Sequence, residues 1–158
     1  PMVIDADGFS AFYKDGTLIK RLKNKCVLTP HAGELSNLIN VPSEVIKKDL
    51  IQSIEKITQS GVGVLVAKGA PSLISDGKYG FINSTGNPGL ATAGSGDILS
   101  GIITSFIAQG YKLIEATVIS CYIHGYAGDI KSKEISERGI IASDLLVEIG
   151  KKLSDYEL

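Results

Sequence analysis

The sequence predicts an α/β domain in which a mostly parallel sheet is covered by helices. Short runs of apolar, β-branched residues alternate with longer segments of helical period, and each apolar run is followed by a loop containing Gly, Pro or Asp. With 158 residues, 44% of them hydrophobic, the chain has the size and composition of one compact domain. The predicted strands are Met2–Asp5, Cys26–Thr29 and Val62–Ala67. Ligands of open α/β sheets bind beyond the carboxyl ends of such strands, so the loops after them are the candidate site.

A long helix is predicted from Ser43 to Ser60. Ser43 is a favourable N-cap residue, apolar residues recur on one stripe of the segment, and Gly61 follows as a stop signal. The charged residues of the segment form its solvent-facing side.

A hairpin is predicted after the third strand. Ser72–Ser75 and Tyr79–Asn83 flank the tripeptide Asp76-Gly77-Lys78, and Asp-Gly between two apolar runs is typical of a tight β-turn. The following segment, 84–93, is rich in Gly, Thr, Asn and Pro, which indicates a loop whose backbone is open to a ligand.

The last third of the chain is predicted to be helical. Apolar residues recur at helical spacing from Gly96 until Gly110, a nearly wholly apolar helix follows over Leu113–Ala127, and another begins near Ser143. No repeat and no interdomain linker interrupts this pattern.

Composition excludes a broad electrostatic attraction to polyanions. The net charge is −1, which disfavours nucleic acid and anionic membrane as partners. The longest apolar run, Ala116–Ile123, is far shorter than the roughly 20 residues that span a bilayer. Cys26 and Cys121 lie in apolar stretches without metal-ligand spacing, so we expect buried reduced thiols and a cytoplasmic protein.

The first residues resemble a strand already in progress. Pro1–Asp5 has neither a leader nor a helix cap before it. We therefore expect that an N-terminal segment is missing from the chain or is supplied by a companion chain.

The strongest local signal is the turn Gly94-Ser95-Gly96-Asp97 at the start of an apolar helix. Glycines let successive N–H groups converge on an anion, and the helix start adds a partial positive charge, so phosphate is the expected guest. The turn lacks the Lys-Ser/Thr ending of a Walker A motif, and Leu99 stands where a dinucleotide fingerprint has its third glycine. A carboxylate there can accept the proton of an attacking hydroxyl. The alternative is a tightly packed loop in which Asp97 only favours the helix dipole.

The segment Thr85–Asp97 resembles the signature of the ADP/ATP-dependent NAD(P)H-hydrate dehydratases, a branch of the ribokinase-like superfamily. The resemblance extends to Val3–Asp7, Leu28–Glu34, Val66–Ala70 and His124–Asp129, and so covers essentially the whole chain. It implies a three-layer ribokinase-like sandwich of which residues 1–158 form the C-terminal portion, incomplete at the N-terminus.

The resemblance also implies roles for individual residues. Asp97 would contact the hydrated nicotinamide nucleotide and act as catalytic base, and His31 would bind the same substrate. Gly94, Ser95 and Gly96 would line the phosphate. The remaining nucleotide-binding residues would be Lys68, Gly69, Ala70, Pro71 and Ser72.

The implied reaction is the repair of hydrated NADH or NADPH, with ADP or ATP as cosubstrate and Mg²⁺ as the phosphate counterion. The segment His31–Glu34 favours ADP, and relatives lead us to expect a homo-oligomer. No protein metal site is predicted. Two alternatives stay open: a ribokinase-like kinase that phosphorylates a sugar or vitamin hydroxyl, and a nucleotide-binding fragment that is inactive alone.

Several polar residues near these motifs have structural interpretations. Asp5 and Asp7 could be paired carboxylates for a metal, but caps of the next helix explain them equally well, so neither is placed in the site. Glu34 is interpreted as support for the His31 turn. Local capping is also the alternative for His31. His124 lies on a nearly wholly apolar helix, where a packing histidine is the favoured interpretation.

Overall fold

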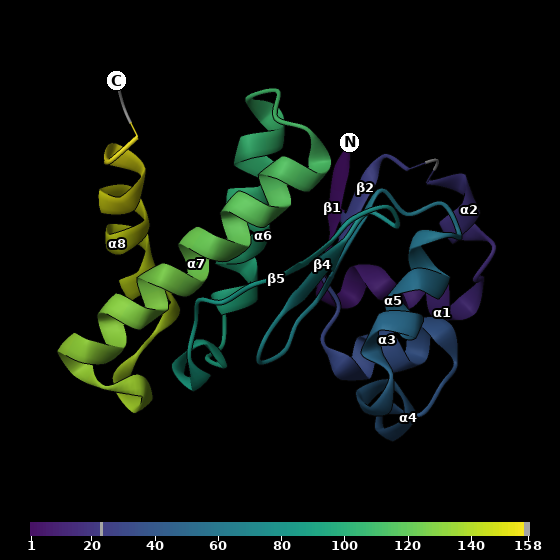
Figure 1. The fold of residues 1–158 in the computed structure, drawn as a ribbon, viewed down its shortest axis with the longest axis horizontal. Helices are drawn as coiled ribbons and strands as arrows, with labels where there is room; N and C mark the ends of the chain where they lie inside the picture. Colours follow the sequence, from purple (N-terminus) through teal and green to yellow (C-terminus); the bar gives the residue numbers. More distant parts are fainter. Residues whose placement is uncertain (23, 157–158) are drawn as a thin grey trace.

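The computed structural model describes residues 1–22 and 24–156, with the backbone alone at residue 47, and is built around one five-stranded sheet (Figure 1). The strands follow one another across the sheet in chain order, as β1 (Met2–Ile4), β2 (Cys26–Leu28), β3 (Val64–Ala67), β4 (Leu73–Ser75) and β5 (Gly80–Ile82). Strands β1, β2 and β3 run parallel, whereas β3, β4 and β5 pair antiparallel. The three predicted strands form the parallel part, and the predicted hairpin forms the antiparallel part.

The central strands are buried on both faces. Every residue of β2 and of β3 is buried, which is the pattern of parallel strands covered by helices on either side. Because successive side chains alternate between faces, Leu65 packs into one core cluster while Val64 and Val66 pack into another.

Helices from the first part of the chain cover one face of the sheet (Figure 1). Phe9, Leu28 and Leu35, all less than 2% exposed, lie in the core cluster on this side. The helices are η1 (Ala6–Phe9), α1 (Ser10–Lys14), α2 (Leu18–Arg21), α3 (Ala32–Ile39), α4 (Ser43–Lys48) and α5 (Leu50–Thr58).

The prediction of one helix over Ser43–Ser60 is wrong, because the segment forms α4 and α5 with a break at Asp49. Asp49 leaves helical geometry with φ −144° and ψ 75°, and its carboxylate accepts a hydrogen bond from the Gln52 amide at 3.0 Å. It is thus the N-cap of a new helix. Ser43 does not cap α4 either, since Pro42 holds the N-cap position without a side-chain hydrogen bond.

The other face of the sheet is covered by α6 (Ser95–Ala108) and α7 (Leu113–Ile135), with α8 (Ala142–Ser154) packed against α7 (Figure 1). Two short 3₁₀ turns, η2 (Pro88–Leu90) and η3 (Glu137–Gly139), complete the chain path. Glu148 of α8, only 5% exposed, lies 3.1 Å from the Lys131 ammonium of α7. Helix α7 extends well beyond the predicted end at Ala127.

Cys26 and Cys121 are free and buried, as predicted. Burial raises the pKa of Cys121 to about 12, so this thiol stays protonated and is a poor nucleophile.

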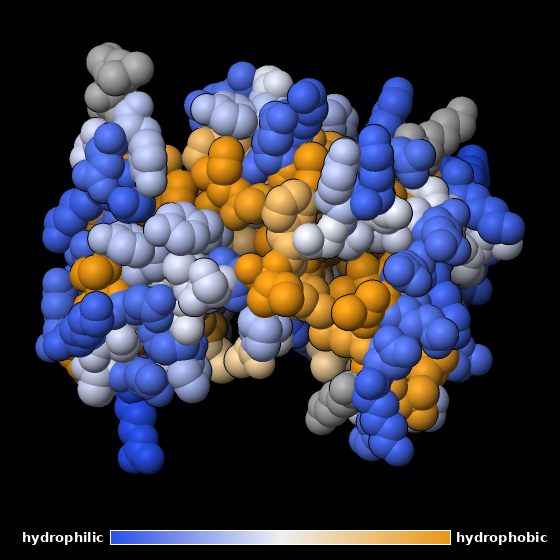
Figure 2. All heavy atoms as spheres, in the orientation of Figure 1, coloured by the Kyte–Doolittle hydropathy of each residue, from blue (hydrophilic) through white to orange (hydrophobic). Residues whose placement is uncertain are grey.

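Some apolar surface remains exposed. Phe81 and Ile82 of the edge strand β5 are 40% and 69% exposed, and Figure 2 shows hydrophobic surface on the face that carries the β4–β5 hairpin. Within residues 1–22 and 24–156, no helix is both long and apolar enough to cross a membrane.

Candidate active site

The turn at the start of α6 has the geometry that the glycines predicted. Gly94 holds the N-cap position in left-handed geometry, with φ +82°, which strongly favours glycine. Ser95 is buried, whereas Asp97 is exposed in the first helical turn. In the part of the chain that the structure describes, no hydrogen bond or ion pair engages the Asp97 carboxylate. First-turn amides have no acceptor within their own helix, so the turn presents N–H donors and a free carboxylate together.

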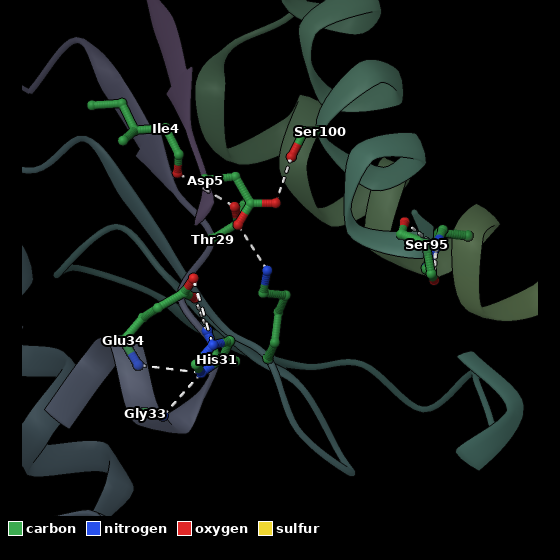
Figure 3. A network of polar contacts seen from close by, with 10 residues as sticks. Ile4, Asp5, Thr29, His31, Gly33, Glu34, Ser95 and Ser100 are labelled. Carbon is green, nitrogen blue, oxygen red and sulfur yellow. Dashed lines mark hydrogen bonds and ion pairs between the residues drawn. The ribbon is translucent and has the colours of Figure 1, made fainter. Parts of the chain in front are cut away.

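Lys68 brings a positive charge to this turn from the end of β3. A Cβ built on Gly96 would lie 3.6 Å from the Lys68 ammonium and 3.3 Å from Asp5 Oδ2, so both side chains border the turn. The ammonium donates to Asp5 Oδ1 at 2.7 Å, and Ser100 Oγ of α6 donates to Asp5 Oδ2 at 3.1 Å. Figure 3 shows the Asp5 carboxylate between the end of β1 and α6.

The charge of Asp5 is set by this contact. Burial raises the pKa of the Asp5 carboxyl, but the hydrogen bond and the positive charge of Lys68 outweigh it, and the pKa lies below its usual value. Asp5 is therefore ionised at neutral pH. Asp5 holds the N-cap position before η1 in extended geometry, but its side chain makes no capping hydrogen bond there.

The loop after Lys68 is exposed and is held by hydrogen bonds between its own residues. Ser72 Oγ accepts a hydrogen bond from the Gly69 amide at 3.3 Å and donates to the Gly69 carbonyl at 3.1 Å, and the Ala70–Pro71 peptide is cis. A cavity of about 370 Å³, lined mainly by apolar side chains, lies between this loop and α3 to α5. The loop therefore offers backbone groups and an apolar recess next to a lysine.

His31 is the N-cap of α3. Its Nδ1 accepts hydrogen bonds from the Gly33 and Glu34 amides at 3.0 and 3.2 Å, while the Glu34 carboxylate accepts from the His31 amide at 2.8 Å. The interpretation of Glu34 as support for this turn is confirmed, and local capping occupies Nδ1 of His31 (Figure 3). The ring stays 61% exposed and borders a second cavity of about 520 Å³, together with Asp7 and Tyr13.

Helix α7 supports the segment that leads into the α6 turn. Thr85 Oγ1 donates to the Tyr122 carbonyl at 2.9 Å, and Asp129 accepts from the Gly86 amide at 2.9 Å and from Asn87 Nδ2 at 3.0 Å. His124 Nε2 lies 3.0 Å from the Ser95 carbonyl oxygen. The loop that carries the glycines is therefore fixed to a buried helix rather than free.

Comparison with known families now decides the relationship. The sequence profile described as NAD(P)H-hydrate dehydratase matches residues 1–151. The chain belongs to the NAD(P)H-hydrate dehydratase family.

Curated members of the NAD(P)H-hydrate dehydratase family are similar to this chain but longer. A bifunctional NAD(P)H-hydrate repair enzyme of Moorella thermoacetica is 40% identical over 148 residues, which are 92% of this chain and 28% of the relative. An ADP-dependent (S)-NAD(P)H-hydrate dehydratase of Neisseria meningitidis is 37% identical over 150 residues, 92% of this chain and 49% of the relative. The chain thus spans half or less of the length of these relatives.

Solved structures confirm the ribokinase-like fold of this family member. An ADP/ATP-dependent NAD(P)H-hydrate dehydratase of Bacillus subtilis, co-crystallised with ATP/Mg²⁺ and soaked with CoA, matches 84% of this chain and 49% of its own, with a TM-score of 0.78 and 27% identity. A ribokinase-like superfamily protein of Enterococcus faecalis matches 98% of this chain and 52% of its own, with a TM-score of 0.82 and 27% identity.

The structure adds two residues to the candidate site of this NAD(P)H-hydrate dehydratase family member. The sequence had indicated only structural roles for both. Asp5 holds Lys68, from 63 positions away in the chain, and His124 contacts Ser95 across 29 positions. The strand-end position of Asp5 and the isolated polar character of His124 in an apolar helix were the available signals. Neither signal identifies a partner.

Among the described residues, no group of three or more His, Cys, Asp or Glu side chains is placed to hold a metal ion.

Proposed function

We propose that the protein carrying this chain is an ADP- or ATP-dependent NAD(P)H-hydrate dehydratase, which restores hydrated NADH or NADPH to the intact reduced cofactor. The observation that carries the proposal is the Asp97 carboxylate on the first turn of α6, which has no partner among the described residues and lies beside amides that suit an anion. Lys68 borders the same turn at Gly96. The names of the Neisseria and Bacillus relatives support the same reaction and the same cosubstrates.

The nucleotide would bind where positive potential gathers. The ammonium of Lys68 and the first-turn amides of Gly96 and Asp97 can face a terminal phosphate, and the 69–72 loop can meet the rest of the nucleotide. Mg²⁺ would neutralise phosphate charge, with phosphate oxygens and water as most of its ligands.

Asp97 would act as the base. It takes the proton from the hydroxyl of the hydrated ring as that oxygen forms a bond to the terminal phosphorus, while the bond from phosphorus to the nucleotide leaving oxygen breaks. Lys68 and the turn amides stabilise the charge that develops on the phosphoryl oxygens. The ring C–O bond then breaks, inorganic phosphate leaves, and loss of a proton from the neighbouring ring carbon restores the double bond.

His31 would contribute to binding of the hydrated dinucleotide. Its Nδ1 is used in the cap of α3, and its Nε2, which lies 3.5 Å from Glu34 Oε1 on a side chain that is 61% exposed, would meet the ligand. The 520 Å³ cavity that it borders supports this assignment.

The proposal also includes a cytoplasmic protein that forms a homo-oligomer. The free, buried cysteines support a reducing compartment. The exposed Phe81 and Ile82 on the edge strand β5 support association between copies.

Asp97→Asn tests the proposed base. The amide keeps the shape of the side chain but cannot accept the proton, so we expect nucleotide affinity within about threefold of the parent and hydrate turnover lower by roughly 10²- to 10⁴-fold. Binding is measured by calorimetry and turnover by the absorbance of the regenerated reduced cofactor.

The matched control is Asp144→Asn. Asp144 holds the same third position in α8 that Asp97 holds in α6, and it only caps its own helix, so turnover should not change. Unchanged turnover in Asp97→Asn would reject the base role. Accumulation of a stable phosphorylated alcohol, with no reduced cofactor regenerated, would instead indicate a hydroxyl kinase.

A further inference from the structure

His124 is a buried polar side chain that contacts the anion-binding turn directly. Only 8% of the residue is exposed, and its Nε2 lies 3.0 Å from the Ser95 carbonyl oxygen and 3.1 Å from Ser95 Oγ. Its neighbours Ile123 and Ala127 belong to an apolar cluster. An apolar residue could fill this volume without the desolvation cost of an imidazole, so packing alone does not account for His124.

The contact defines the form of the ring. A carbonyl oxygen only accepts hydrogen bonds, so the bond to the Ser95 carbonyl forms in the tautomer that carries its proton on Nε2, whereas in the other tautomer Nε2 accepts from Ser95 Oγ. Burial lowers the pKa of His124 below its usual value despite the opposing effect of the Ser95 hydrogen bond, and the Lys68 charge lowers it further. The ring is therefore a neutral imidazole, and in either tautomer its Nε2 bonds to Ser95.

Several residues of α7 contact the signature segment, Thr85–Asp97, and His124 makes the contact that is nearest in sequence to Asp97. Tyr122 and Asp129 hold the outer part of the segment, at Thr85 and at Gly86. His124 instead contacts Ser95, which lies between the two glycines of the turn itself. The orientation of the next two amides and of Asp97 follows from where Ser95 is held.

We propose that His124 is a positioning residue, which fixes Ser95 and thereby aims the Gly96 and Asp97 amides and the Asp97 carboxylate at the reacting phosphate and hydroxyl. The catalytic part of this proposal rests on the proposed function, in which Asp97 is the base. The structural part, that His124 holds the turn, stands independently of any activity.

The test compares His124→Phe with His124→Gln. Phenylalanine fills the volume but cannot donate, whereas the glutamine amide can place a donor close to the position of Nε2. Since a misplacement of about 1 Å can cost roughly 100-fold in rate, we expect kcat for hydrate dehydration to fall by about 10- to 100-fold in His124→Phe, with a smaller change in KM for the nucleotide. His124→Gln should recover a large part of that loss.

Ser120→Ala is the matched control for a general loss of stability. Ser120 is buried on the same helix, one turn earlier, but among the described residues its hydroxyl bonds only to the Ala116 carbonyl, at 2.6 Å. We expect this variant to retain kcat.

Amide hydrogen exchange provides a readout that needs no activity. The amides of Ser95 and Ile98 donate to the Thr92 and Gly94 carbonyls at 3.3 and 3.2 Å, so they report how firmly the turn is held. We expect faster exchange at these two amides in His124→Phe, partial recovery in His124→Gln and no change in Ser120→Ala. Exchange that is unchanged in His124→Phe overturns the proposal whatever the protein catalyses. Loosened exchange in a protein whose parent form does not dehydrate the hydrate supports the structural part and removes the proposed function. Equal losses of kcat in the Phe and Gln variants, with Ser120→Ala equally impaired, would reduce His124 to a packing role.

Discussion

The ion pair between Asp5 and Lys68 makes the folding stability depend on the ionisation of one carboxyl group, that of Asp5. The two side chains are only 15% and 25% exposed, so the Lys68 charge depends on Asp5 for compensation in the free protein. Asp5→Asn keeps the shape of the side chain but removes the negative charge. We expect the free energy of unfolding at pH 7 to fall by about 1–3 kcal/mol, measured by urea denaturation.

The same variant predicts the direction of the acid dependence. The pKa of Asp5 is lowered in the folded protein, so the stability it contributes is fully present above the ordinary carboxyl pKa of about 3.9 and is lost as the pH falls through the folded pKa. The gap between parent and Asp5→Asn should therefore close below about pH 4. The control is Asp155→Asn, because the Asp155 side chain that pairs with Lys152 is 58% exposed, and this variant should change stability by less than about 0.5 kcal/mol. A gap that stays constant from pH 7 to pH 3 would contradict the prediction.

At the residue scale, the sequence predicted the features that depend on neighbouring residues and missed the contacts between distant ones. The Gly94–Asp97 turn depends on glycine geometry and on a helix start, both of which are readable from adjacent positions. The contact of Asp5 with Lys68 depends on the parallel register of β1, β2 and β3, which brings distant strand ends to one edge of the sheet. No pattern within either segment contains that information.

At the element scale, the predicted helix boundaries failed where tertiary contacts override propensity. The predicted end of α7 at Ala127 followed the nearly wholly apolar stretch of the sequence, yet the helix continues to Ile135. Leu90 packs so closely that a Cβ on Gly128 would lie 2.7 Å from it. Gly125 and Gly128 therefore let the signature segment pack closely against α7, and they do not end the helix.

Gly125→Ala tests this close approach. A Cβ at Gly125 would lie 2.7 Å from the Thr85 carbonyl carbon and oxygen and would also overlap Thr85 Oγ1. Because backbone atoms must move to make room, we expect a loss of about 1–3 kcal/mol in the free energy of unfolding.

Gly101→Ala is the opposite case on α6. A Cβ there meets no heavy atom within 4 Å, so the lower entropy of the unfolded chain should raise stability by about 0.5–1 kcal/mol. Thermal denaturation of the two variants should show shifts of opposite sign. Two stabilising shifts would mean that the Thr85 loop does not rest on α7.

At the scale of the whole molecule, alternation of apolar strands and helices was enough to predict an α/β sandwich. The two faces follow from the same alternation, because Leu65 and Val66 enter different core clusters. The strand order and the mixed direction of the sheet do not follow from it. Strand order and direction depend on contacts between strands that are distant in the sequence. The candidate site, which combines residues of β1, β3 and α6, depends on the same contacts.

This assembly predicts that nucleotide binding stabilises the chain as a unit. Phosphate held by Lys68 and by the α6 turn would link a strand of the sheet to a helix that covers it. Ligand at about 100 times its dissociation constant adds about 2.7 kcal/mol, which for a chain of this size corresponds to a rise in Tm of roughly 5–10 °C. Differential scanning fluorimetry with ADP and with ATP, each with Mg²⁺, measures the shift. In Lys68→Met we expect most of the shift to disappear, while Lys112→Met, at a surface lysine with an 81% exposed side chain, should keep it. Equal shifts in the parent and in Lys68→Met would exclude Lys68 from the nucleotide site.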